Sequence, residues 1–363
     1  SSDLNWMAGS QYVYSFGKCI FMPADLTAGI EFNQDKLEDN MWGYHRTVDQ
    51  KVNIGSAFFQ NEWKNEHWGF LIGGRLDKHN LIDHVIFSPR ANLRYNPTEN
   101  INLRFSYSSG FRAPQAFDED LHVENVGGNV AMVELADNLK EERSQSLSAS
   151  ADIYHRFGAF QVNFLVEGFY TKLSDVFALT DGEVVDGILT RTRYNAPGAR
   201  VMGLTLEGKM AYLTKFQVQA GVTLQQSHYS EPHVWNKEAP AVKKMMRTPN
   251  TYGYFTATYT PIKPLSIALS GTYTGSMLVP HEPVPGFLEK PITVNTKDFF
   301  DIGLKAAYDF KLYKSMNLQV NAGVQNIFNA YQNDFDKGAD RDSGYIYGPS
   351  LPRSFFAGVK ISY

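Results

Sequence analysis

Apolar and polar side chains alternate over long segments of this sequence, and residues 316–328 show the pattern clearly. The two sets are Met316, Leu318, Val320, Ala322 and Val324 against Asn317, Gln319, Asn321, Gly323 and Gln325. A period of two predicts a β-strand with one apolar and one polar face, because successive side chains of a strand point to opposite sides. Such a strand fits a soluble sheet whose apolar face is covered by protein, or a membrane barrel whose apolar face meets lipid.

Fifteen segments of the chain alternate in this way. Most are about ten residues or longer, which is the length that a tilted strand needs to cross a bilayer. The predicted strands are residues 4–16, 19–32, 51–62, 67–77, 85–95, 101–113, 143–156, 159–173, 190–212, 215–229, 251–260, 264–277, 297–310, 316–328 and 353–363.

The connections between these segments are alternately short and long. The long ones are residues 33–50, 114–142, 230–250, 278–296 and 329–352. Outer-membrane barrels have short periplasmic turns and long extracellular loops, whereas a soluble sandwich has no reason to sort its loops in this way. The sequence therefore predicts an all-β fold, a transmembrane antiparallel β-barrel with about 15 strands here. A large soluble all-β protein is the alternative.

Composition excludes several other classes of protein. No run of about 18 apolar residues is present, so a transmembrane helix is excluded. The net charge of −4 gives no nucleic-acid signature. Cys19 is the single cysteine, so an intramolecular disulfide is impossible. The sequence contains no nucleophile elbow, HExxH motif or glycine-rich phosphate loop, and we expect no enzymatic activity.

The strand count predicts that the chain is part of a larger barrel. If the last strand ends on the periplasmic side, fifteen strands place the first residue outside. Single-chain bacterial barrels have an even number of strands and both ends on the same side. We therefore expect residues 1–363 to be the C-terminal part of a barrel that is nicked, split or truncated at an external loop.

Four quoted segments carry a family resemblance. They are "SSGFRAPQAFDEDL" (108–121), "LKEERSQSLSASADIY" (139–154), "VQNIFNAYQNDF" (324–335) and "GPSLPRSFFAGVKISY" (348–363). In this order they resemble the barrel of TonB-dependent outer-membrane receptors, over the chain from Ser108 to its end. The resemblance implies a barrel of about 22 strands around an N-terminal plug, with the plug, the first strands and the TonB-contacting segment absent from residues 1–363.

The resemblance implies an active transporter in the bacterial outer membrane. It would bind a scarce, large nutrient at external loops for TonB-energised uptake and would require no cofactor. The continuation "DEDLHVENVGG" (118–128) looks most like cobalamin receptors, so cobalamin is the first expected substrate. A ferric-siderophore or haem receptor is the alternative, and a passive porin is a further one. Expected partners are TonB, the barrel-assembly machinery, outer-membrane lipid and lipopolysaccharide, and a surface lipoprotein lid, but no nucleic acid.

Aromatic and histidine side chains in the predicted external loops are candidate ligand contacts, because flat aromatic surfaces suit a large ligand. The set is Trp42, Tyr44, His45, His233, Trp235, Phe287, Tyr345 and Tyr347. Packing within the loops is an equally natural role for these side chains.

Four carboxylates in one external loop, Asp334, Asp336, Asp340 and Asp342, have a spacing that can converge on Ca²⁺. The EF-hand pattern does not match, because Gly338 stands at its third ligand position. A solvated loop, in which Lys337 and Arg341 neutralise part of the charge, is the interpretation that we favour.

Two further segments suggest contacts with the cell envelope. Tyr363 ends an alternating strand, and the family resemblance implies that a terminal aromatic is a signal to the barrel-assembly machinery, although most members end in Phe. "VKKMMR" (242–247) places three cations near the outer rim, where lipopolysaccharide phosphates lie. A solvated run of charges is the alternative for this segment.

Overall fold

The structure is a computed structural model. It describes residues 1–115, 124–126, 129–313 and 315–363. Part of the "DEDLHVENVGG" motif therefore lies outside the described residues.

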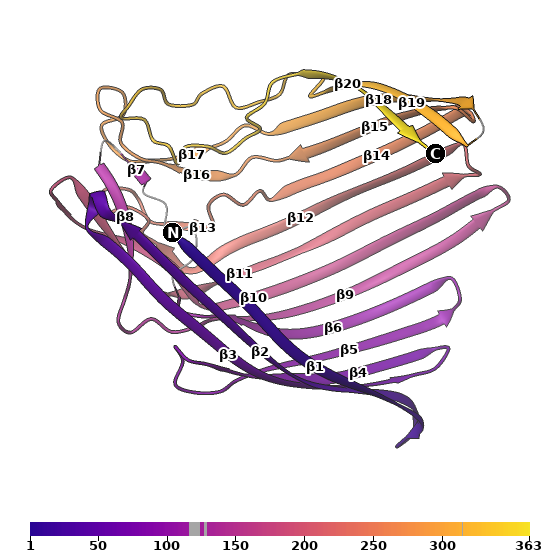
Figure 1. The fold of residues 1–363 in the computed structure, drawn as a ribbon, viewed down its shortest axis with the longest axis horizontal. Helices are drawn as coiled ribbons and strands as arrows, with labels where there is room; N and C mark the ends of the chain where they lie inside the picture. The colour runs from indigo at the N-terminus through magenta and orange to yellow at the C-terminus, as the bar shows by residue number, and fades with distance from the viewer. Residues whose placement is uncertain (116–123, 127–128, 314) are drawn as a thin grey trace.

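Fifteen strands form one antiparallel sheet in which each strand pairs with the next one along the chain (Figure 1). They are β1 Ser2–Cys19, β2 Met22–Met41, β3 Arg46–Lys64, β4 Trp68–His79, β5 Ile86–Thr98, β6 Ile101–Arg112, β9 Glu142–Phe157, β10 Phe160–Val185, β11 Ile188–Tyr212, β12 Phe216–His233, β14 Thr251–Ile262, β15 Leu265–Thr274, β18 Phe299–Tyr313, β19 Met316–Gln325 and β20 Ser354–Ser362. Every predicted strand is present, which confirms the all-β antiparallel fold. Within the described pairings, β1 pairs only with β2, and β20 only with β19.

The long connections carry smaller elements at one edge of the sheet, on the left in Figure 1. These are the 3-10 turn η1 Trp42–Tyr44, and the strands β7 Glu124–Val126, β8 Asn129–Leu135, β13 Val242–Lys244, β16 Leu278–His281 and β17 Ile292–Asn295. β8 runs parallel to the end of β11, β13 pairs with the end of β12, and β16 and β17 form a separate hairpin. In the described ranges, no helix is long and apolar enough to cross a membrane.

The predicted long loop at residues 33–50 is wrong. β2 and β3 remain paired through this segment as far as Met41 and Arg46, so only a tight turn is left. β10 likewise continues beyond its predicted end at residue 173, as far as the pair of Val185 with Ile188 at the start of β11. We attribute both misses to the environment, since hairpin ends that project beyond the apolar belt meet water on both faces and need no alternation.

One face of the sheet carries apolar side chains that no other part of the described chain covers. Tyr308 lies opposite Val320, and Val320 lies opposite Val359. The exposed fractions are 42% for Val320 and 67% for Val359. The buried apolar clusters of the described residues contain only three residues each. This face, called the outward face below, is therefore suited to contact with lipid rather than with a second protein layer.

The opposite, inward face carries polar side chains that bond to one another across strands. Ser56 Oγ donates to Asp77 Oδ1 (2.6 Å), and Arg75 donates to Asp77 (2.7 Å) and to Glu31 (2.8 Å). Among the last strands of the sheet, Gln319 of β19 donates to Asp309 of β18 (2.9 Å). A polar lining is what the alternation predicts for the wet interior of a barrel.

Candidate functional site

Side chains from residues 275–298 and 326–353 pack together at the edge of the sheet that carries the long connections. Met277, Val279 and Tyr345 are buried, and Val294 and Tyr347 pack against them. Val279 and Val294 are direct partners in the β16–β17 hairpin, so one face of this short hairpin supplies the apolar centre. We call these residues, with the polar side chains around them, the loop cluster.

His281 and Asp336 form a largely buried side-chain pair in the loop cluster. The imidazole of His281 stacks on the ring of Tyr345, with centroids 3.8 Å apart and planes at 7°. Its Nε2 lies 2.8 Å from Asp336 Oδ2, and 7% and 5% of these two side chains are exposed. The contacts of His281 with Asp336 and Tyr345 hold residues 326–353 against the end of β16.

Two tyrosines of the predicted ligand set share one carboxylate. Asp334 Oδ2 accepts hydrogen bonds from the hydroxyls of Tyr347 (2.7 Å) and Tyr345 (3.3 Å). Burial and the negative charge of Asp334 raise the pKa of Tyr345 to about 12. Burial and the bond to Asp334 also raise the pKa of Tyr347. Both hydroxyls therefore act as neutral donors at physiological pH.

Hydrogen bonds and an ion pair tie two further segments, β11 and residues 230–250, to the loop cluster. Asp342 Oδ2 accepts from the backbone N–H of Glu282 (2.8 Å). The carboxylate of Glu282 in turn accepts from Asn236 (2.9 Å) and pairs with Arg191 of β11 (3.5 Å). Arg247 donates to two backbone carbonyls in residues 326–353. The external surface here is a connected structure rather than a set of separate loops.

The four candidate calcium ligands do not converge on one point in the described structure. Asp334 bonds to tyrosines, Asp336 to His281, and Asp342 to backbone amides, whereas Asp340 is exposed. Among the described residues, no group of three or more metal-ligating side chains is placed to hold an ion. Calcium binding in this loop remains a prediction.

The other predicted ligand contacts lie outside the loop cluster. Trp42 (83% exposed), Tyr44 and His45 form the tip of the β2–β3 hairpin, and Phe287 (76% exposed) lies between β16 and β17. His233 ends β12, where its ring is 4.8 Å from that of Tyr229, and Trp235 follows two residues later. The structure thus brings Tyr345 and Tyr347 together and leaves the remaining candidates on separate segments. Their ligand roles remain predictions.

A second candidate group, which the sequence did not reveal, stacks two arginines on one aromatic ring. Arg112 Cζ lies 5.7 Å from the ring centroid of Phe177, and Arg193 Cζ lies 6.0 Å from it. The strand register places Arg112 on the inward face with Asn102 and Arg104. Arg112 is exposed, whereas Arg193 is buried. An arginine held over an aromatic face is suited to bind an anionic, aromatic ligand.

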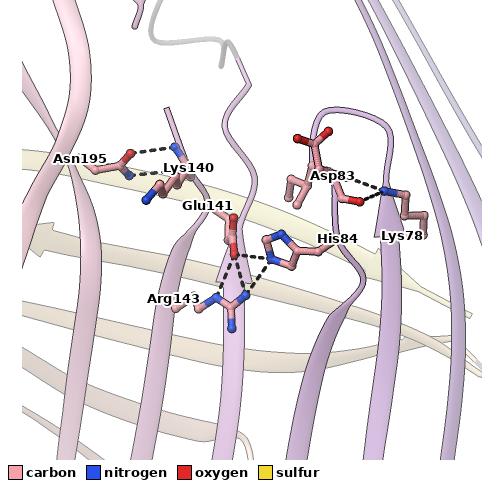
Figure 2. A network of polar contacts seen from close by, with 8 residues as sticks. Lys78, Asp83, His84, Lys140, Glu141, Arg143 and Asn195 are labelled. Carbon is pink, nitrogen blue, oxygen red and sulfur yellow. Dashed lines mark hydrogen bonds and ion pairs between the residues drawn. The ribbon is translucent and has the colours of Figure 1, made fainter. Parts of the chain in front are cut away.

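A third polar group lies at the rim on the outward face (Figure 2). Glu141 Oε1 accepts from Arg143 (2.6 Å) and lies 3.0 Å from His84 Nε2. Burial by itself raises the pKa of the Glu141 carboxyl, but the bonds from Arg143 outweigh burial and leave the pKa below its ordinary value. Figure 2 also shows Lys78, which donates to the backbone carbonyl of Asp83 in the adjacent turn.

Comparisons with known proteins identify the family. The model of the TonB dependent receptor-like β-barrel matches residues 2–327. A search of curated proteins finds no significant match. Among solved structures, a mutant of the ferric enterobactin receptor PfeA from Pseudomonas aeruginosa has a TM-score of 0.70 at 18% identity, over 98% of this chain and 53% of that chain.

Two other solved structures are similar. The ferric-catecholate import receptor Fiu from E. coli has a TM-score of 0.69 at 14% identity, and the siderophore receptor PirA from Acinetobacter baumannii has 0.67 at 16%. Each comparison covers 98% of this chain and 54% of the other, so this chain spans about half the length of these receptors. At such identities the likeness establishes the fold, and the family model covers most of the sequence. The chain belongs to the TonB-dependent receptor β-barrel family.

Proposed function

We propose that this chain is the barrel part of an outer-membrane receptor that binds a ferric siderophore of the catecholate type and imports it with energy from TonB. The observation that carries the proposal is the set of structural neighbours, which includes the ferric enterobactin and ferric-catecholate receptors. Cobalamin, the first expectation from the sequence, has no specific support among these neighbours. The ferric-siderophore alternative is therefore the stronger one.

The Arg112–Phe177–Arg193 group supports this substrate class. A ferric catecholate complex has a net negative charge and presents aromatic rings at its surface. A guanidinium can bond to anionic catecholate oxygens and also stack on an aromatic ring. Arg112 offers this chemistry on the inward face, while Phe177 and the backbone around it are fixed by the bond from Phe177 N–H to Glu142 (3.1 Å). A passive porin needs no such preorganised group.

A binding panel tests the substrate. The full-length receptor in detergent is titrated with a ferric catecholate, a ferric hydroxamate, haem and cobalamin, and we expect the ferric catecholate to bind most tightly. Arg112→Ala should weaken that binding by about 10- to 100-fold, since a charge-assisted hydrogen bond contributes roughly 1.5–3 kcal/mol. Arg156→Ala is the matched control, because Arg156 bonds to the carbonyl of Gly158 in a turn at the opposite edge of the sheet.

Uptake of the iron complex by cells should require TonB. Preferred binding of cobalamin or haem would replace the proposed substrate, and unchanged affinity in Arg112→Ala would remove this residue from the site. Uptake that persists without TonB would favour the porin alternative. The partner roles of the barrel-assembly machinery, through the fully exposed Tyr363, and of a lipoprotein lid remain proposals.

A further inference from the structure

Four basic side chains lie side by side across consecutive strands on the outward face. Lys172 of β10 is the direct partner of Arg200 on β11, Arg200 is the partner of His228 on β12, and His228 is the partner of Lys244 on β13. Direct cross-strand partners point to the same side of a sheet, with Cβ atoms about 5 Å apart. We call these four residues the basic row.

The register places the basic row immediately beside the apolar belt. On β10, Lys172 follows Tyr170, and on β11, Arg200 precedes Met202. Tyr170 and Met202 are themselves partners, and both are exposed on the outward face. The row lies toward the edge that carries the long connections, which is the extracellular edge of a barrel in this family.

No carboxylate neutralises the basic row among the described ion pairs. Glu141, an acidic group at the same rim, is already engaged by Arg143 and His84 (Figure 2). Like charges directly opposite each other destabilise a sheet. Lys172 opposite Arg200 is therefore costly unless an anion outside the described chain lies against the pair.

An apolar groove of about 840 Å³ opens on the outward face next to the row, on the side of the apolar belt. Its lining includes Leu147, Gly168, Tyr170, Met202, Leu204 and Leu224. Gly168 helps to open the groove, because a Cβ built at this position meets no atom within 4 Å. The groove thus continues from the basic row into the apolar belt.

We infer that the basic row and the groove together form a binding site for a phosphorylated, multiply acylated glycolipid of the outer leaflet. Lys172 and Arg200 would pair with phosphate oxygens, and His228 and Lys244 would extend the basic surface. An acyl chain would fill the groove beside Gly168. The combination of adjacent cations with an apolar groove on the lipid side of the sheet matches a phosphorylated lipid better than a free anion.

The charge half of the site is tested with Lys172→Gln/Arg200→Gln in the full-length receptor. The receptor is placed in phosphatidylcholine nanodiscs and titrated with the phosphorylated glycolipid, with its dephosphorylated form and with inorganic phosphate. We expect about thirtyfold weaker binding of the phosphorylated glycolipid, because each cation near an anionic lipid surface contributes about fivefold. Lys215→Gln/Lys263→Gln, in exposed turns at the opposite edge, removes the same charge and should leave binding unchanged.

The groove half is tested with Gly168→Leu, which fills the groove and keeps every cation. Binding of the phosphorylated glycolipid should fall by at least about tenfold, since a buried chain loses several methylene contacts. Gly208→Leu is the matched control. It lies on the same face, has equally open space around its Cβ position, and does not line the groove.

Three results would overturn the assignment. Equal binding of the dephosphorylated glycolipid would remove the role of the basic row, and binding of inorganic phosphate as tight as that of the glycolipid would leave an ion site instead. Unchanged glycolipid binding in both test variants would remove the site altogether. Binding of the ferric catecholate should be the same in all variants, so failure here is distinguishable from failure of the proposed function, and that binding also shows that each variant is folded.

Discussion

The side chain at position 320 distinguishes the two environments of the sheet at the residue scale. Val320 lies on the outward face between Tyr308 and Val359, whereas its neighbour Asn321 lies inward opposite Ala307 and Gly358. The two residues share a backbone setting, so a difference in their response to the same substitution reports the environment of each face.

Val320→Arg should lower the free energy of unfolding by about 2–4 kcal/mol, because it places a guanidinium among lipid chains near the middle of the bilayer. Asn321→Arg is the control, and it should cost much less because its side chain enters a wet interior. The measurement is a urea titration of folded protein in lipid vesicles. Equal costs for the two variants would contradict the assignment of faces.

At the scale of the element, alternation allowed the fifteen strands to be predicted wherever one face meets lipid. Residues 316–325 show why, since lipid on one side and water on the other impose opposite demands on successive side chains. The extensions of β2, β3 and β10 were missed, because alternation is not required beyond the bilayer. The hairpin of β16 and β17 was also missed, since four-residue strands contain too few alternations to detect.

The candidate sites were less predictable than the strands. The sequence identified Tyr345 and Tyr347 as notable aromatics but gave no sign that they share Asp334. The Arg112–Phe177–Arg193 group was not found at all, because its members come from three strands that only the register brings together. Arg112 was present in the "GFRAP" motif, but a motif match does not show which ring the guanidinium covers.

One cross-strand pair fixes the packing of β14 against β15. Phe255 lies opposite Gly271, and a Cβ at Gly271 would stand 2.3 Å from the Phe255 ring. Gly271→Ala should therefore lower the free energy of unfolding by about 1–3 kcal/mol through overpacking. Phe255→Leu in the same chain should relieve part of that loss. Gly208→Ala, where the space is open, should be neutral or stabilising by about 0.5–1 kcal/mol; a similar loss there would show that the ring contact is not the cause.

At the scale of the whole molecule, a single curved sheet is suited to have lipid on its outward face and water on its inward face, and it does not enclose a large apolar core. The described apolar clusters are small, and exposed apolar side chains extend from β1 to β20. The outer edges of β1 and β20 have no partner in the described pairings, and such edges are costly in lipid, where backbone groups have no water to bond to. Further strands, as expected from the sequence, would satisfy them, and that expectation remains a prediction.

Such a molecule should depend on lipid or detergent for its solubility. Membranes that contain the receptor are washed first with high salt and then with alkaline buffer, which remove proteins held by charge. We expect the receptor to stay in the membrane pellet, because its outward face is held by the apolar contacts of Val320, Val359 and similar side chains rather than by ion pairs. A mild detergent should release it, and removal of the detergent should cause aggregation as these side chains meet water. Release into buffer without detergent, with the receptor still folded, would mean that protein and not lipid covers the outward face.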